Sequence, residues 1–485
     1  MPSETSVVDG VGKELFIGGK WTPASSGQTF EVRDPATGEV LCRVADAAPA
    51  DGAAALDAAV AAQDSWASHP PRERGEILHR AYEELTSRVD ELALLMTLEM
   101  GKPLAESRGE IAYAAEFFRW FSEEAVRIDG GYATAPNGTG RFLVTRQPVG
   151  PSLLVTPWNF PMAMGTRKIG PAIAAGCTSV IKPAAQTPLS MLALAQILAD
   201  AGLPDGVLNV VTTTDAGGVM EPLIRDGRAR KLSFTGSTAV GRRLLEQCAD
   251  KVLRTSMELG GNAPFVVFAD ADLDAAVDGA MQAKMRNIGE ACTAANRFYV
   301  QREVADEFAS RMAERMAAQP IGRGTEDGVV VGPLIDDAAL TKVTELVSDA
   351  TERGARLLTG GSGVDGPGHF YRPTVLADVP AEARMSSEEI FGPVAPISTF
   401  DTEDEAVRVA NDTEYGLVSY LYTSDLKRAL RVAERLEAGM VGLNQGIVSN
   451  PAAPFGGVKQ SGLGREGGRV GIDEFLETKY IAVAM

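Results

Sequence analysis

Short apolar runs alternate with helical stretches from Gly150 onward, and this alternation constrains the fold more than any other feature of the chain. The apolar runs are residues 153–155, 179–181, 208–211 and 231–234, with helical stretches such as 189–201 between them. This alternation is typical of a doubly wound parallel sheet, whose ligands bind at the carboxyl ends of the strands. Asn159, Lys182 and Gly236 follow three of the runs, so we expect them at a ligand-binding edge.

The rest of the chain divides into regions with different patterns. At 485 residues, two or three domains are expected. Residues up to about 44 are typical of turns and short strands, and the apolar spacing between 49 and 129 predicts helices. A second α/β stretch runs from about 259 to 443, with a strand at 265–268 and a helix at 272–285. Residues 141–147 are consistent with half of a two-stranded arm, and 479–483 with an exposed terminal strand open to pairing with another chain.

Charge and composition exclude several classes of function. The formal net charge is −19, which repels polyphosphate backbones, so we expect no nucleic-acid partner. An anionic substrate would need a local cationic pocket. The three histidines and four cysteines show no metal-ligand or disulfide spacing, so no metal is expected. Neither a secretory signal nor an apolar run of about 20 residues is visible, and we expect a cytoplasmic protein without a membrane partner.

Two residues can carry nucleophilic catalysis. Cys292 is a candidate nucleophile because a thiolate is the strongest side-chain nucleophile near neutral pH. Glu258, in an apolar and glycine-rich setting, is a candidate general base for releasing what the thiol has captured. The alternatives are ordinary ones, since most free cysteines are small buried hydrophobic residues and most glutamates are solvated surface charges.

The motifs around these residues resemble those of the NAD(P)-dependent aldehyde dehydrogenase superfamily over nearly the whole chain. They are Pro157-Trp158-Asn159-Phe160-Pro161, Phe234-Thr235-Gly236-Ser237, Met257-Glu258-Leu259-Gly260-Gly261, Gly289-Glu290-Ala291-Cys292 and Glu389-Ile390-Phe391-Gly392-Pro393. The resemblance implies that Cys292 is the nucleophile and Glu258 the deacylating base. It also implies that Asn159 forms an oxyanion hole with the backbone N–H of Cys292.

The resemblance implies a fold of two doubly wound parallel-sheet α/β domains plus a small β oligomerisation arm. The cofactor-binding domain is predicted to span residues 1–128 and 147–257, and the catalytic domain 258–445. Residues 129–146 and 471–485 would form the arm, and 446–470 a returning segment that lines the substrate tunnel. A homodimer or homotetramer is expected.

The expected cofactor is NADP or NAD. Gly236 to Gly241 lacks the GxGxxG pattern but matches the variant turn of the family, with the pyrophosphate near the helix start. By resemblance, Lys182 binds the adenosine ribose, Glu389 the nicotinamide ribose, and Phe391 lies beside the ring. The remaining candidates for cofactor binding are Thr156, Trp158, Phe234, Gly236, Ser237 and Gly241. Ala185 stands where NAD-specific relatives often carry Glu, which favours NADP; the alternative is that Ala185 only relaxes selectivity.

The resemblance is closest to the succinate semialdehyde dehydrogenases, through residues 98–113, Arg167-Lys168 and 454–466. It implies that Arg167, Arg286 and Ser449 hold the carboxylate of the substrate and that Phe455 lines the tunnel. Guanidinium groups suit this task because they bind carboxylates bidentately. The alternative is that the arginines form structural ion pairs. Two departures from the family are Glu290, usually Gln, which would raise the thiol pKa if it points inward, and Asn450, which leaves the preferred chain length open.

These observations predict oxidation of succinate semialdehyde, or a similar ω-carboxylate aldehyde, to the dicarboxylate through a cysteine thiohemiacetal and thioester. One alternative is a dehydrogenase for glutarate semialdehyde, 2-oxoglutarate semialdehyde or a neutral aldehyde. Another is a catalytically silent structural protein on the same fold.

Overall fold

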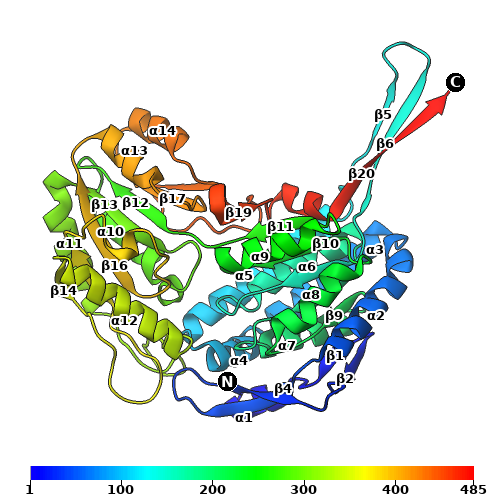
Figure 1. Cartoon of the computed structure of the whole chain (residues 1–485), viewed down its shortest axis with the longest axis horizontal. Coiled ribbons are helices and arrows are strands. Elements are labelled where there is room, and N and C mark those ends of the chain that lie inside the picture. The colour runs from blue at the N-terminus through cyan, green and yellow to red at the C-terminus, as the bar shows by residue number, and fades with distance from the viewer. Residues whose placement is uncertain (1) are drawn as a thin grey trace.

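The computed structural model describes residues 2–485 and consists of two α/β lobes with a β arm that projects from one of them (Figure 1). The first lobe contains an eight-stranded sheet of order β19-β11-β10-β7-β8-β9-β1-β2. Its strands are β1 (Leu15–Ile17), β2 (Lys20–Thr22), β7 (Ser152–Val155), β8 (Ser179–Lys182), β9 (Leu208–Val210), β10 (Lys231–Thr235), β11 (Arg254–Glu258) and β19 (Gly462–Leu463). The five central strands are parallel; β7, β8, β9 and β10 were predicted, whereas β11 was not. Strands β1, β2 and β19 pair antiparallel at the edges.

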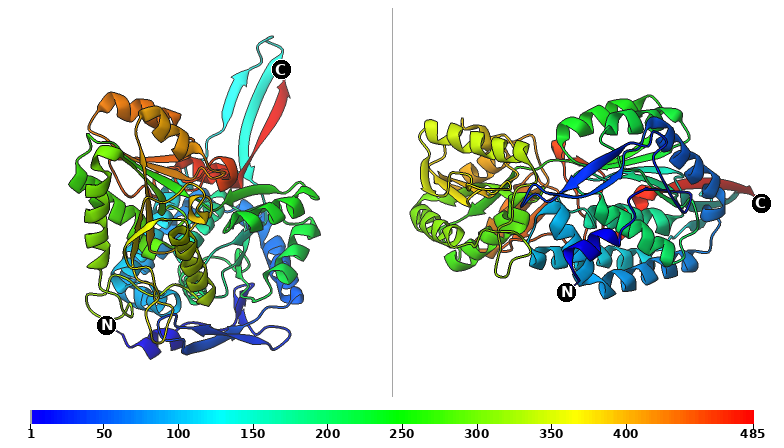
Figure 2. Two further views of the ribbon diagram at one scale, coloured as in Figure 1. Left: turned by 60° about the vertical axis from the view of Figure 1, so that its left-hand side comes forward. Right: turned by 90° about the horizontal axis from the view of Figure 1, so that it is seen from below.

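The second lobe contains a seven-stranded sheet of order β14-β15-β16-β13-β12-β17-β18, in which only the edge strand β14 is antiparallel among the described strands. Its strands are β12 (Ala263–Val267), β13 (Ala295–Gln301), β14 (Arg356–Thr359), β15 (Thr374–Ala377), β16 (Val394–Phe400), β17 (Val418–Tyr422) and β18 (Met440–Leu443). Its helices are α10 (Leu273–Met285), α11 (Arg302–Ala317), α12 (Asp337–Glu352), α13 (Glu403–Asn411) and α14 (Leu426–Arg435). The right-hand view of Figure 2 shows the two lobes side by side.

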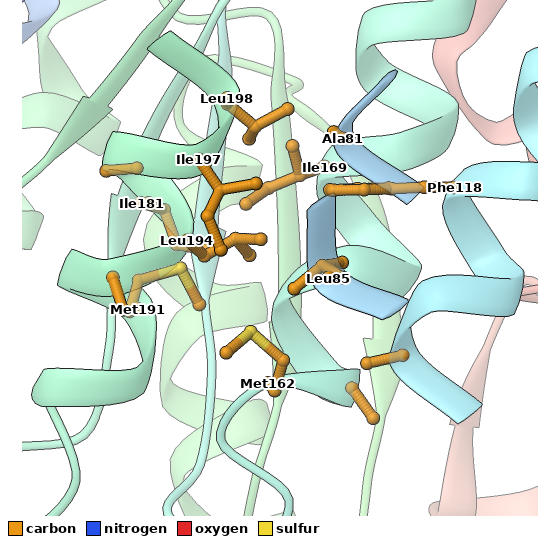
Figure 3. Packing of buried hydrophobic residues seen from close by; sticks show 14 of the residues in the cluster. Ala81, Leu85, Phe118, Met162, Ile169, Ile181, Met191, Leu194, Ile197 and Leu198 are labelled. Carbon is orange, nitrogen blue, oxygen red and sulfur yellow. The ribbon is translucent and has the colours of Figure 1, made fainter. Parts of the chain in front are cut away.

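Helices cover both faces of the first sheet. They are α2 (Pro49–Ala67), α3 (Pro71–Ser87), α4 (Val89–Met100), α5 (Leu104–Glu124), α6 (Ala163–Ala175), α7 (Leu189–Asp200), α8 (Ala216–Asp226) and α9 (Thr238–Ala249). Leu85 on α3, Phe118 on α5, Ile169 on α6 and Leu194 on α7 meet in one buried cluster (Figure 3). Burying each such side chain contributes about 1.5–3 kcal/mol. Every residue of α6 is buried, so this helix holds its polar side chains in fixed positions.

The arm is a three-stranded sheet of order β20-β6-β5, not the two-stranded arm expected from the sequence. It consists of β5 (Gly131–Thr134), β6 (Gly140–Pro148) and β20 (Leu476–Ala484), and β20 pairs with β6 along its whole length. The remaining elements are α1 (Glu4–Asp9), which the sequence pattern did not predict, the hairpin β3 (Thr29–Arg33) and β4 (Val40–Ala45), and four 3-10 turns. These turns are η1 (Arg286–Gly289), η2 (Arg384–Ser386), η3 (Lys459–Ser461) and η4 (Arg469–Phe475).

Within residues 2–485, none of the helices combines the length and the apolar character needed to cross a lipid bilayer.

Candidate active site

Cys292 lies on a loop between α10 and β13 whose backbone is held in an uncommon conformation. Asn287, Ile288 and Gly289 have consecutive positive φ angles of 50°, 50° and 82°. A β-branched residue such as Ile288 is strained in this region by about 1–3 kcal/mol, so the surrounding structure must hold the loop in place. Gly289 cannot be replaced without movement, because a Cβ there would lie 2.2 Å from the carbonyl oxygen of Gly392.

Asn159, which follows β7, is fixed against this loop by hydrogen bonds. Its Nδ2 donates to the Glu290 carbonyl over 3.0 Å. Asn287 Nδ2 donates to the same carbonyl over 2.9 Å and to the Asn159 carbonyl over 3.1 Å, and Lys102 Nζ donates to the Asn159 carbonyl over 2.7 Å. One N–H of the Asn159 amide remains for another acceptor. The sequence analysis missed both Asn287 and Lys102, although Lys102 lies inside the segment 98–113 that carried the resemblance and Asn287 lies two residues before the motif at 289–292.

Glu258 ends β11 and is 3% exposed. Within the described part of the chain, neither carboxyl oxygen has a hydrogen-bond partner. Burial and then the neighbouring Glu466 raise the pKa of Glu258 well above its usual value, while Arg167 acts in the opposite direction. The carboxyl lies against the backbone of Gly456, where a Cβ would come within 2.8 Å of Oε1. A buried carboxyl group with a raised pKa binds a proton more strongly than an exposed one, which suits general-base work.

The Cys292 thiol is also shifted by its surroundings. Burial raises the pKa of Cys292 to about 12, the Arg167 charge lowers it, and Glu389 and Glu258 raise it further. The Glu290 side chain does not point toward the thiol, since its Oε1 accepts the backbone N–H of Ile335 over 3.2 Å. Glu290 therefore lacks the inward orientation under which the sequence analysis expected it to raise the thiol pKa.

A cavity of about 250 Å³ is lined by Cys292 together with half of the predicted cofactor residues. Trp158, Asn159, Gly236, Ser237, Glu389 and Phe391 line it with Cys292. The rings of Trp158 and Phe391 meet edge to face at 5.5 Å, and Phe391 has a positive φ of 58°. Through Ser237, Lys342 and Glu389 the cavity adjoins a larger one of about 820 Å³ along α9.

The chemistry of this cavity fits a dinucleotide. Ser237 caps α9, and the first N–H groups of a helix favour a phosphate. Side chains at Gly236 and Gly241 would collide with Phe234 and Leu259, so the backbone stays open to close approach. Thr156 Oγ1 and Thr235 Oγ1 are buried without a partner among the described residues, which leaves two polar atoms for a ligand.

Lys182 ends β8 and Ala185 lies on the loop that follows. Within the described residues, neither lines the cavity of Cys292. Burial lowers the pKa of Lys182 to about 8. Ala185 borders a separate cavity of about 700 Å³ with Gln186 and Glu99.

Arg286 and Ser449 are brought together, as the resemblance implied. Arg286 Nη1 donates to Ser449 Oγ over 2.9 Å, and both line a cavity of about 580 Å³. The guanidinium lies over the rings of Phe160 and Tyr113, at 4.9 and 5.7 Å from their centroids. No carboxylate of residues 2–485 forms an ion pair with Arg286. Its charge is thus available to a ligand.

Arg167 occupies a different setting. It is 1% exposed on α6, its Nε pairs with one Glu466 oxygen, and Lys168 binds the other. The Phe455 ring covers the guanidinium at 4.2 Å. Arg167 and Phe455 do not line the cavity of Arg286 within the described residues. A structural ion pair of Arg167 is the alternative that the sequence analysis gave to binding of the substrate carboxylate.

Comparisons with known proteins agree with this arrangement. The model of the aldehyde dehydrogenase family matches residues 21–481. A succinate-semialdehyde dehydrogenase of Paenarthrobacter nicotinovorans is 61% identical over 445 residues, covering 92% of this chain and 99% of that protein. A glutarate-semialdehyde dehydrogenase of Pseudomonas putida is 50% identical over 473 residues, covering 98% of each. The crystal structure of an NADP-dependent enzyme of E. coli has a TM-score of 0.97 and 50% identity, covering 98% of both chains.

The matched residues include the second sheet, the five central strands of the first sheet and the segments that carry Cys292, Glu258 and Asn159. The predicted fold class is confirmed by the agreement with the solved structure. The predicted enzyme class, an oxidoreductase that uses NAD or NADP, is confirmed by the family. The chain belongs to the aldehyde dehydrogenase family.

Proposed function

We propose that the chain oxidises succinate semialdehyde, or a similar ω-carboxylate aldehyde, to the dicarboxylate, with NADP⁺ as the preferred cofactor. The observation that carries the proposal is Arg286, whose guanidinium lines a cavity, bonds Ser449 and has no acidic partner among the described residues. In a chain of net charge −19, an arginine that lines a cavity and forms no ion pair among the described residues is suited to bind an anion, although Glu106 and Glu110 line the same cavity. The first relative reported above is named for this same activity.

Substrate binding follows from this geometry. Arg286 binds the carboxylate bidentately, Ser449 adds a hydroxyl donor, and the rings of Phe160 and Tyr113 limit where the guanidinium can lie. Arg167 stays paired with Glu466 and contributes through its charge, while Phe455 covers it. The aldehyde end then lies toward Cys292.

The residues around Cys292 perform the chemistry in two stages. The Cys292 thiolate attacks the aldehyde carbon, and the Asn159 amide and the Cys292 N–H stabilise the thiohemiacetal oxyanion. Bound NADP⁺ supplies the hydride acceptor that turns the thiohemiacetal into a thioester. Glu258 takes a proton from water, which hydrolyses the thioester and restores the thiol. Asn159 is already held at the Cys292 loop by Glu290, Asn287 and Lys102.

Cofactor binding is assigned to the lining of the Cys292 cavity and to the loop after β8. The start of α9, with Ser237, holds the pyrophosphate, and Glu389 and Phe391 hold the nicotinamide end. Lys182 and Ala185 face the adenosine ribose, where Ala185 offers no carboxylate to repel a 2′-phosphate. Comparing kcat/KM for NADP⁺ and NAD⁺ tests the preference, and a strong NAD⁺ preference would contradict it.

The main experiment measures NADPH formation from NADP⁺ and succinate semialdehyde, with Cys292→Ala as the control. Turnover that disappears in the control supports both the reaction and the nucleophile. Arg286→Met should lower kcat/KM for succinate semialdehyde by about 30–100-fold, since a charge-assisted hydrogen bond contributes about 2–3 kcal/mol. For a neutral aldehyde of the same length, kcat/KM should change little in Arg286→Met. An equal loss for both aldehydes would instead indicate a structural role for Arg286.

Glutarate semialdehyde is a second candidate, because a relative 50% identical over 473 residues is named for it. It differs from succinate semialdehyde by one methylene, which a pocket distinguishes by about 1–3 kcal/mol. The ratio of kcat/KM for the two aldehydes decides between them.

We further propose that the protein is a cytoplasmic homodimer or homotetramer assembled through the arm. The three-stranded sheet exposes aromatic side chains, with Tyr132 67% and Tyr480 66% exposed. Exposed aromatic residues on an edge-bearing sheet are typical of a contact surface.

A further inference from the structure

A buried lysine lies behind the active site, and the proposed chemistry assigns it no task. Lys284, in the last turn of α10, is 0% exposed. Its Nζ donates to Asn296 Oδ1 over 2.8 Å and to the Gly392 carbonyl over 3.2 Å. No acidic side chain of residues 2–485 forms an ion pair with it. A buried cation without a partner is costly, so its presence calls for a reason other than packing.

The first bond closes the base of the loop that carries the nucleophile. Lys284 is the penultimate residue of α10, before Cys292, and Asn296 is the second residue of β13, after it. The bond between their side chains therefore joins the two ends of the segment 284–296. Within this segment, Asn287 and Ile288 keep the positive φ angles that place Cys292. A strained loop of this kind needs an external restraint, and Lys284 supplies one.

The second bond reaches the segment that borders the cofactor cavity. Gly392 directly follows Phe391, and both Phe391 and Glu389 line the cavity with Cys292. The Gly392 carbonyl also touches the nucleophile loop itself, since a Cβ at Gly289 would lie 2.2 Å from its oxygen. One amino group thus holds the nucleophile loop and the cofactor segment at a fixed separation.

The charge state of Lys284 is compatible with this arrangement. Burial lowers the pKa of Lys284 to about 7, with Glu389 acting in the opposite direction. A neutral amine still has two N–H groups, which matches the two acceptors in place. The bridge therefore persists when the lysine loses its charge.

Resting on the NAD(P)-dependent reaction proposed above, we infer that Lys284 is a positioning residue that couples occupancy of the cofactor site to the placement of the Cys292 thiol. A ligand that orders the segment 389–392 then orders the nucleophile loop through the Lys284 bridge. Conversely, a change in the conformation of the nucleophile loop alters the contacts of the segment 389–392 with the cofactor. Lys284 acts only through these groups and touches no substrate.

The experiment measures alkylation of Cys292 by iodoacetamide, with and without saturating NADP⁺, by mass spectrometry of the tryptic peptide that contains Cys292. No aldehyde is needed, so the result is independent of the proposed substrate. In the wild-type protein, NADP⁺ should change the alkylation rate about fivefold or more, as expected for coupled sites. In Lys284→Met, which keeps the side-chain length but removes both donors, the ratio should fall close to one although NADP⁺ still binds.

Two further variants keep the inference open to contradiction. Asn296→Leu should lose the coupling in the same way, and Asn296→Asp, which keeps an acceptor for Lys284, should retain it. Lys231→Met is the matched control, because Lys231 is also a buried lysine but binds Ser256 and Glu474 in the first lobe. Its alkylation ratio should equal that of the wild type, even if its melting temperature falls.

The outcomes are distinguishable from those of the proposed function. If NADP⁺ binds Lys284→Met and still changes the alkylation rate as in the wild type, the coupling role is wrong and the dehydrogenase proposal is untouched. If NADP⁺ binds the wild-type protein without changing the alkylation rate of Cys292, the coupling role of Lys284 is also wrong. If neither NADP⁺ nor NAD⁺ raises the melting temperature of the wild type, the cofactor assignment fails and the inference fails with it.

Discussion

The pKa values of three buried glutamates, Glu466, Glu258 and Glu290, are shifted in different directions because their partners differ. Burial alone would raise the pKa of Glu466, but Lys168 and Arg167 together hold it below its usual value. Glu258, next to it, has no hydrogen-bond partner among the described residues, and its pKa is raised. Glu290 is fully buried with a single backbone donor, and its pKa is raised as well. The environment thus lowers the pKa of one carboxyl group and raises the pKa of the other two.

The role of Glu258 predicts a split between two kinetic phases. In Glu258→Gln, attack by Cys292 and hydride transfer should proceed, but no carboxylate activates water for hydrolysis of the thioester. We expect one equivalent of NADPH per site in a rapid burst, followed by steady turnover lowered by about 100-fold or more. Stopped-flow absorbance at the NADPH band measures both phases. A variant that loses the burst together with the turnover would assign Glu258 to the first stage instead.

Glu290 predicts a change in how stability depends on pH. Its pKa in the folded protein is raised above the unfolded value, so the folded state favours the protonated form. Wild-type stability must therefore fall as the pH rises above about 4.5, while Glu290→Gln avoids this loss. At about pH 8 the variant should be more stable by roughly 1 kcal/mol or more, with no gain at about pH 4.

Thermal unfolding at the two pH values measures this difference. Glu434→Gln, at an exposed position on α14, is the control and should change little at either pH. A gain of equal size at both pH values would show that titration of Glu290 is not its cause.

At the scale of elements, the central strands were predictable and the edges of the sheets were not. The run at 153–155 is continuously apolar because β7 is buried along its whole length. By contrast, β19 has two residues and β1 three, and they pair only because the folded chain brings them to the sheet. Local sequence carries little signal for such short strands.

The same limit applies to the candidate site. Cys292, Asn159 and Glu258 were recognisable because each lies in a local motif. The pairing of Arg167 with Glu466 was not, because the two residues come from distant parts of the chain and the sequence does not show which acid an arginine meets. Lys284 likewise became visible only through its bonds to Asn296 and Gly392.

Helix α7 illustrates such a long-range contact and yields a prediction about stability. Pro188 precedes the helix and supplies no side-chain cap; instead Glu99 from α4 accepts the N–H groups of Leu189 and Ser190, over 2.7 and 2.9 Å, and the Ser190 hydroxyl. Removing this acceptor leaves buried donors unpaired. Glu99→Ala should therefore lower the free energy of unfolding by about 1–3 kcal/mol.

Urea denaturation measures this loss, with Glu434→Ala on the exposed face of α14 as the control, expected within about 0.5 kcal/mol of the wild type. Glu99→Gln retains one acceptor oxygen and should lose less than Glu99→Ala. Equal stability of the wild type and Glu99→Ala would show that water replaces the carboxylate at the start of α7.

At the scale of the whole molecule, the arm leaves apolar side chains and strand edges uncovered in a single chain. Its strands pair with each other and extend away from both lobes (Figures 1 and 2). Its exposed residues include Tyr132, Tyr480, Ile481 and Val483, so apolar surface lies where no part of the same chain covers it within the described residues. Strands β5 and β20 are also sheet edges with unpaired backbone groups. A second copy of the chain would cover both the side chains and the edges.

This reasoning predicts that a charge on the arm dissociates the oligomer without unfolding the subunit. In Tyr480→Asp, association should weaken by about 2 kcal/mol or more, roughly 30-fold in Kd, because a buried aromatic contact is replaced by a desolvated carboxylate. Light scattering after size exclusion should then give a smaller mass at micromolar concentration.

The matched control is Leu426→Asp on α14, which alters an equally exposed apolar residue, 69% exposed, in the other lobe. If both variants keep the wild-type mass, or both lose it, the arm is not the specific contact. If only Tyr480→Asp loses the wild-type mass, the activity of the smaller species shows whether each subunit carries a complete active site. We expect that it does, because Cys292, Glu258 and Asn159 all come from one chain.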